Sequence, residues 1–209
     1  MNAELLASPI GLVAAVIALT VVLVGISTLF WGLFRLFTVP GVVVHEFAHK
    51  QACDLVGVPV LEVAYFRFGD PPGYVRHGQP ERYRESFVVS VAPFLGNTLV
   101  AFAAFLGLAA LLETTGELRT ASLTTVATAL ALGWFGLSIG MHAFPSTGDA
   151  NALWDRSRAE WRQSPRVLLG VPFVVVIYVA NLLSWLWADL LYAIGLFVLA
   201  AWVVGIGPV

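Results

Sequence analysis

Two histidines and a glutamate share one short apolar segment of the chain. The residues His45-Glu46-Phe47-Ala48-His49 form an H-E-x-x-H pattern. Residues four apart in an α-helix lie on the same face, one turn apart, so both imidazoles can bind one Zn²⁺ ion. Glu46 follows the first histidine and is expected to act as general base toward a water molecule that the metal activates. The pattern therefore predicts a catalytic zinc site in which His45 and His49 are metal ligands and Glu46 is the catalytic residue.

The alternative is that the pattern arose by chance, since five residues with two free positions recur in large proteomes. The residues around it argue against chance, because the motif follows the apolar run Val39-Pro40-Gly41-Val42-Val43-Val44. An ionised side chain in a membrane helix costs about 2.5–3.5 kcal/mol on insertion scales. A membrane helix rarely keeps such residues without a function, so the segment is interpreted as functional.

A catalytic zinc site usually has three protein ligands and one open position. Asp149 is the expected third ligand, because Pro145 and Gly148 interrupt a long apolar stretch just before it. Unwound backbone at that point can direct the carboxylate toward the metal. Two alternatives stay open: Asp149 caps the helix that follows it, or His142 is the ligand instead. Weaker rivals lie in a polar segment: His77 and Glu85.

The composition indicates where such a site must lie. The chain has 209 residues, of which 59% are hydrophobic and 11% charged, and its mean hydropathy is +0.86. Soluble domains are about 45–50% apolar and about 25% charged, so a soluble enzyme is excluded. A net charge of −2 provides no basic surface for nucleic acid, and the single Cys53 excludes an intrachain disulfide framework. We therefore expect an integral, multi-pass protein of the cell membrane whose surroundings are the lipid bilayer.

A bilayer core needs about 20 apolar residues in helical conformation. The sequence predicts an all-α polytopic fold with about six transmembrane helices in a single membrane domain, residues 1–209. A first span over residues 9–35 precedes a core over residues 36–154, which contains a polar loop over residues 58–85. A C-terminal helical hairpin over residues 167–209 completes the domain. The apolar runs behind these spans are residues 9–34, 36–48, 86–112, 120–148, 167–188 and 190–209.

Pro40 leaves open whether residues 9–56 form two spans or one kinked helix. Residues 50–85 and 149–166 together carry nine of the eleven Lys and Arg residues. Basic loops face the cytoplasm, and a count of six spans places both segments on that side. Within the first of them, a stretch rich in β-branched and aromatic residues and a Gly-Pro turn signal predict a small cytoplasmic β-hairpin over residues 61–76.

Taken together, these motifs resemble the site-2 protease family of intramembrane zinc metalloproteases. That family combines an H-E-x-x-H in one membrane helix with a distant Asp in another, near a Pro-containing break. Here His45, Glu46 and His49 match the first motif and Asp149 matches the second. The resemblance covers residues 36–154 and implies a three-helix metalloprotease core.

Two departures make this chain a divergent relative. Many members carry Gly-Pro-x-x-Asn on the intervening helix, where this chain reads Ala92-Pro93-Phe94-Leu95-Gly96-Asn97. The glycine is thus an alanine, and Asn97 stands one residue late. The family's aspartate is commonly followed by glycine, whereas Ala150 follows Asp149 here.

The resemblance implies a zinc metalloendopeptidase that hydrolyses a peptide bond in or next to a membrane helix. The implied cofactor is Zn²⁺, and the implied partner is a membrane-protein or membrane-peptide substrate; the sequence carries no signal of the oligomeric state. Candidate substrate-binding residues are Asn97, Tyr65 and His142. The hairpin that contains Tyr65 either pairs with an unwound substrate through its edge strand or caps the site. The alternative function is a non-proteolytic metal-binding membrane protein, a transporter or a helix-binding scaffold, which needs the ligands but not Glu46 as a base.

Overall fold

The structure is a computed structural model that describes residues 8–116 and 120–206. It is mostly helical and contains one small two-stranded sheet. The chain divides into two compact units, Met1–Phe37 and Thr38–Val209. Each unit is described by itself, and every candidate site residue belongs to the second.

Helix α2 runs from Pro9 to Val56 with Pro40 inside it. The apolar runs over residues 9–34 and 36–48 therefore belong to one helix, and no turn separates them. In the first unit, the described side chains of this helix are mostly apolar and almost all exposed. This is the pattern of a helix surrounded by lipid.

Among the described residues, four helical segments are long and apolar enough to cross a bilayer, which supports a membrane protein. They are Pro9–Val56, Tyr83–Thr115, Leu123–Gly140 and Val167–Leu186, and a shorter apolar helix covers Ala188–Val204. The first two apolar runs of the sequence thus lie in one helix and the last lies in a shorter one, and the number of helices that cross the bilayer stays a prediction. The expected break before Asp149 is present: α4 ends at Gly140, and α5 begins at Thr147.

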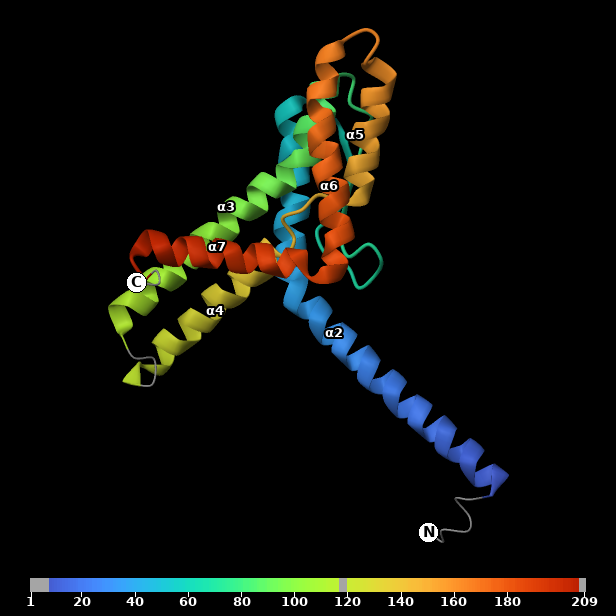
Figure 1. Cartoon of the computed structure of the whole chain (residues 1–209), viewed down its shortest axis with the longest axis vertical. Helices are drawn as coiled ribbons and strands as arrows, with labels where there is room; N and C mark the ends of the chain where they lie inside the picture. The colour runs from blue at the N-terminus through green and yellow to red at the C-terminus, as the bar shows by residue number, and fades with distance from the viewer. Residues whose placement is uncertain (1–7, 117–119, 207–209) are drawn as a thin grey trace. The chain divides into compact units, whose positions relative to one another are not determined.

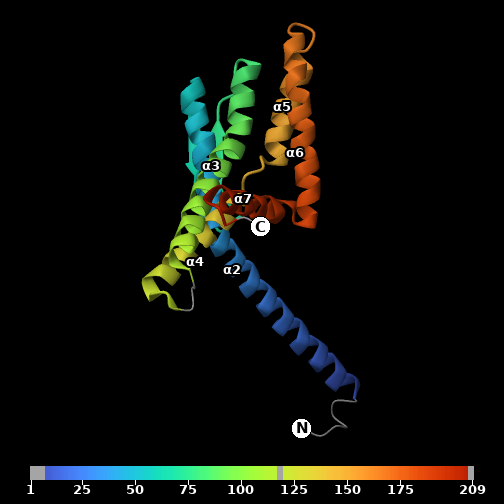
Figure 2. The ribbon, with the colours of Figure 1, turned by 60° about the vertical axis from the view of Figure 1, so that its left-hand side comes forward.

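Helix α3 (Tyr83–Thr115) is central to the second unit and packs against α4 (Leu123–Gly140), α5 (Thr147–Glu160) and α7 (Ala188–Val204). Helix α6 (Val171–Leu183) lies beside α5 in both views (Figures 1 and 2). Short 3₁₀ segments, Pro165–Gly170 and Ser184–Leu186, flank α6.

Small residues allow these helices to approach closely. Gly136 of α4 lies against the Phe105 ring of α3, and Gly140 lies against Ala193 of α7. Close approach at small residues is the usual way in which membrane helices pack. The buried cluster around them contains Ala101, Phe105, Ile139, Leu196 and Ala200.

The expected hairpin is confirmed as an antiparallel pair of strands, β1 (Val60–Ala64) and β2 (Tyr74–His77). Glu62 of β1 accepts hydrogen bonds from the Tyr74 hydroxyl at 2.6 Å and from Arg76 Nη1 at 3.0 Å. These two hydrogen bonds hold the pKa of Glu62 below its usual value, and Glu62 in turn raises the pKa of Tyr74. The polar face of the hairpin is thus held by cross-strand pairs.

The two basic segments of the sequence lie together. The Arg156 guanidinium of α5 donates to the carbonyl of Glu81, just before α3. This contact joins the segment that follows the hairpin to the helix that follows Pro145. Both segments therefore lie at the same end of α3, and their cytoplasmic position stays a prediction.

Candidate metal centre

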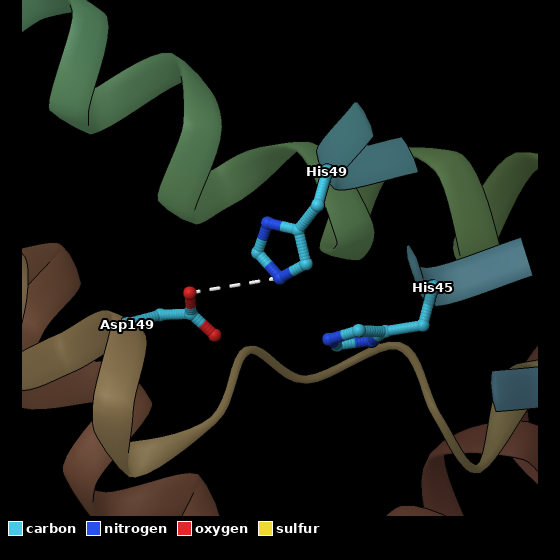
Figure 3. A group of neighbouring side chains, drawn as sticks. All are labelled: His45, His49 and Asp149. Carbon is cyan, nitrogen blue, oxygen red and sulfur yellow. Dashed lines mark ion pairs between the residues drawn. The ribbon is translucent and has the colours of Figure 1, made fainter. Parts of the chain in front are cut away.

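His45 and His49 come from adjacent turns of α2, and Asp149 comes from the first turn of α5. Figure 3 shows the two imidazole rings and the carboxylate converging on one point. The ligand-capable atoms of the three residues all lie within 4.8 Å of one another, and His49 Nε2 lies 3.6 Å from Asp149 Oδ1. In a tetrahedral zinc site with bonds of about 2.0–2.1 Å, ligand atoms are about 3.3 Å apart. Small side-chain movements would therefore bring all three onto one ion.

Each histidine is oriented by a backbone carbonyl. His45 Nδ1 lies 2.8 Å from the carbonyl oxygen of His142, and His49 Nδ1 lies 2.9 Å from that of Val89. Because a carbonyl can only accept, Nδ1 carries the proton in both rings, and Nε2 keeps the lone pair that binds a metal. Histidines that bind metals in proteins typically donate their other N–H in this way.

Asp149 combines two roles. Its Oδ2 accepts from the Ser146 backbone N–H at 2.8 Å and from Ser146 Oγ at 2.6 Å, which forms a capping box at the start of α5. Its Oδ1 faces His49. Burial raises the pKa of Asp149, but the nearby His49 ring and the Ser146 hydrogen bonds outweigh it and lower the pKa to about 2. The helix-cap role and the position of a ligand are therefore compatible.

Glu46 is 8% exposed and lines a cavity of about 290 Å³ together with His45 and His142. The hairpin loop covers this glutamate: a Cβ atom on Gly73 would lie 2.7 Å from Glu46 Cγ and 3.1 Å from Glu46 Oε1. The carboxylate is thus next to a ligand-capable histidine, in a cavity large enough for a water molecule.

A second cavity lies on the Asp149 side of the cluster. Its volume is about 400 Å³, and its walls come from α3, α5 and the segment that follows β2. His77, one of the weaker rivals for metal binding, lines this cavity. His45 therefore lines the cavity that contains Glu46, and Asp149 lines the second cavity.

The candidate substrate-binding residues occupy different environments. Asn97 is fully buried and lines neither cavity. Tyr65 follows β1, is 38% exposed and also lines neither cavity. His142 lines the cavity of Glu46, and its Nδ1 donates to the Ser138 carbonyl at 2.9 Å. Among the described residues, the group of ligand atoms contains Asp149 and not His142.

Sequence reasoning missed the groups that hold the site together. These include the carbonyls of Val89 and His142, and Gly73 against Glu46. Backbone carbonyls leave no residue signature. The only available signal was Pro93, which lies four residues after Val89 and removes the N–H that would otherwise bind its carbonyl.

The donor set fits zinc. Two imidazole nitrogens and one carboxylate oxygen are a combination that catalytic zinc sites use, with the fourth position open for water. Comparisons of the chain with protein-family models, curated proteins and solved structures found no match in any of the three. Membership of the site-2 protease family therefore stays a prediction from the motifs.

Proposed function

We propose that this chain is an intramembrane zinc metalloprotease that hydrolyses a peptide bond in or next to a membrane helix. The observation that carries the proposal is the convergence of His45, His49 and Asp149 within 4.8 Å, with Glu46 in the cavity that His45 lines. The long apolar helices support a location in a membrane. The proposal includes the cell membrane as that location and a cytoplasmic position for the basic segments.

Each residue has a defined task in this proposal. His45, His49 and Asp149 would hold Zn²⁺, which when bound would supply the Lewis acidity for activating water near neutral pH and for polarising a carbonyl. Glu46 accepts the proton of the attacking water and delivers it to the leaving amine. The loop at Gly73 keeps the Glu46 side chain against this cavity.

The base assignment is tested with Glu46→Gln, which removes the proton acceptor and keeps the size of the side chain. Wild-type and variant protein are reconstituted in liposomes with single-span peptides, and cleavage products are identified by mass spectrometry. We expect Glu46→Gln to keep its zinc and to lose cleavage by a factor of about 10²–10⁴. Glu113→Gln, an exposed carboxylate at the far end of α3, is the matched control and is expected to cleave at the wild-type rate.

Two results would count against the proposal. Cleavage by Glu46→Gln at the wild-type rate would exclude Glu46 as the base. The second result is a wild-type protein that binds zinc but cleaves no membrane peptide, with a Glu46→Gln variant that transports metal or binds its partner as well as the wild type does. That result would favour the metal-binding transporter or scaffold instead.

A further inference from the structure

The carbonyl that orients His49 is available because of a proline. In a regular helix the N–H of residue 93 donates to the carbonyl of residue 89. Residue 93 of α3 is a proline and has no N–H. The Val89 carbonyl instead accepts from His49 Nδ1 at 2.9 Å. Pro93 therefore creates, inside a long helix, the free acceptor that this histidine uses.

The carbonyl that orients His45 is available for a similar reason. His142 lies beyond the end of α4, where the next N–H groups along the chain would come from residues 145 and 146. Residue 145 is a proline, and the N–H of Ser146 donates to Asp149 Oδ2. The His142 carbonyl therefore accepts from neither of these backbone positions, and His45 Nδ1 donates to it at 2.8 Å.

Asn97 fixes the position of this second carbonyl. Its Nδ2 lies 3.0 Å from the His142 oxygen and 3.1 Å from the carbonyl oxygens of Gly41 and Ile139. Two hydrogens thus serve three acceptors, one in α2, one in α4 and one in the segment that leads to Asp149. The Asn97 side chain has no exposed surface, so these contacts are shielded from competing water.

We propose that Pro93 and Asn97 are positioning residues that together set the orientation of both metal-binding histidines. They lie four residues apart on α3, on one face of the helix, and both side chains are fully buried. Pro93 acts on His49 because it leaves the Val89 carbonyl free to accept from that ring. Asn97 acts on His45 because it donates to the His142 carbonyl that accepts from that ring. Neither residue belongs to the group of ligand-capable side chains or lines either cavity beside it, and the inference rests on the proposed metal site.

The first test is Pro93→Ala, measured as zinc affinity by competition with a chromophoric chelator in detergent. The new N–H of residue 93 will bind the Val89 carbonyl and compete with His49 Nδ1. Loss of a group that orients a metal ligand typically lowers affinity about 10–100-fold, and we expect a fall in that range. The midpoint of thermal unfolding is expected to change little, because the gain from replacing an interior proline by the best helix former is opposed by the small cavity that the lost ring atoms leave.

This pair of results separates positioning from a structural role, because a merely structural change would move stability and affinity in the same direction. The matched control is Pro40→Ala, which removes the interior proline of α2. The carbonyl that Pro40 frees is that of Leu36, four residues earlier, and neither histidine donates to it. Zinc affinity is expected to stay at the wild-type value in this control.

The second test is Asn97→Leu, which keeps the size of the side chain and removes its donor. Ser138→Ala is the control where α2 meets α4. The Ser138 hydroxyl oxygen accepts from the Gly41 N–H and is not bonded to either of the carbonyls that accept from His45 and His49. Both changes are expected to lower the thermal midpoint. Only Asn97→Leu is expected to weaken zinc binding about tenfold or more and to change the visible absorption spectrum of the Co²⁺-substituted protein.

If Asn97→Leu does not fold, Asn97→Ser gives the same measurement with a single hydroxyl donor and an intermediate loss of affinity. Wild-type zinc affinity and an unchanged Co²⁺ spectrum in both Pro93→Ala and Asn97→Leu would overturn the inference while leaving the proposed function intact. Absence of zinc from the wild-type protein would instead overturn the proposed metal site, and the inference with it.

Discussion

Ser146 and Asp149 hydrogen-bond to each other at the start of α5, and this contact determines which oxygen of Asp149 faces His49. The Asp149 N–H donates to Ser146 Oγ at 3.2 Å, while Asp149 Oδ2 accepts from the N–H and the hydroxyl of Ser146. Oδ1 is then directed to His49 Nε2. The Asp149 carboxylate thus caps the first turn of α5 with Oδ2 and presents Oδ1 as a possible metal ligand.

The cap and the ligand can be separated by mutation. We expect Ser146→Ala to keep one zinc per chain, with stability lowered by about 0.5–2 kcal/mol through the lost cap. Asp149→Ala removes both groups and is expected to lose the zinc. His142→Ala is expected to keep it, because the His142 ring lies outside the ligand group and the His142 carbonyl remains. Metal content after dialysis measures all three; zinc kept in Asp149→Ala and lost in His142→Ala would make His142 the third ligand.

Two features of the candidate metal centre depend on local rules, and the sequence predicted both of them. The spacing of His45 and His49 places them on one helical face, and Pro145 breaks the helix before Asp149. The acceptors of the histidines depend on which helix packs beside α2, and no local pattern records that. The same holds for Pro40, which a local rule treats as a break, although α2 continues through it. In membranes, interior prolines are tolerated where other groups bind the freed carbonyl.

Gly41 marks the close contact of α2 with α4. A Cβ atom there would lie 2.1 Å from the Ser138 carbonyl oxygen and 2.5 Å from His142 Nδ1. Backbone cannot move away cheaply, so Gly41→Ala is expected to cost about 1–3 kcal/mol or more of stability and to weaken zinc binding. Thermal unfolding in detergent measures the first effect. Gly195→Ala in α7, where no atom lies within 4 Å, is the control and is expected to be neutral or slightly stabilising.

The sidedness of the basic segments can be tested by cysteine labelling of intact cells. Cys53 is fully buried and is replaced by Ser in the background. Gln79→Cys and Arg158→Cys lie in the two basic segments, whereas Ala121→Cys lies between α3 and α4. Since α3 has 33 residues, it is about 50 Å long, which is enough to place its two ends on opposite sides of a bilayer. We expect a membrane-impermeant thiol reagent to label only Ala121→Cys from outside.

Permeabilised cells provide the control, because all three cysteines should then react. If the reagent labelled Gln79→Cys and Arg158→Cys from outside, the proposed orientation of the chain in the membrane would be wrong. Opposite behaviour of these two positions would contradict the contact between Arg156 and Glu81.

The hairpin loop at Gly73 is expected to set the position of Glu46, the proposed base, without affecting zinc binding. A Cβ atom on Gly73 would lie 2.7 Å from Glu46 Cγ and 2.8 Å from Val42 Cγ1, so Gly73→Ala must displace the Glu46 side chain or lift the loop. Either movement misplaces the proton acceptor, and we expect cleavage to fall at least about tenfold, which corresponds to about 1.4 kcal/mol in the barrier. Zinc content and zinc affinity should not change, because the three atoms nearest to the added methyl group belong to Glu46 and Val42 and not to a proposed ligand.

The control for this prediction is Gly69→Ala in the same loop. The three atoms nearest to a Cβ atom on Gly69 belong to the guanidinium end of Arg67, which is flexible and can move aside at little cost. Gly69→Ala should therefore cleave at the wild-type rate, so that the two variants differ only in whether the added methyl group reaches Glu46. Equal cleavage by both would mean that the loop does not position Glu46. Loss of zinc from Gly73→Ala would mean instead that the loop supports the metal centre, because the methyl group would then act on the ligands rather than on the base alone.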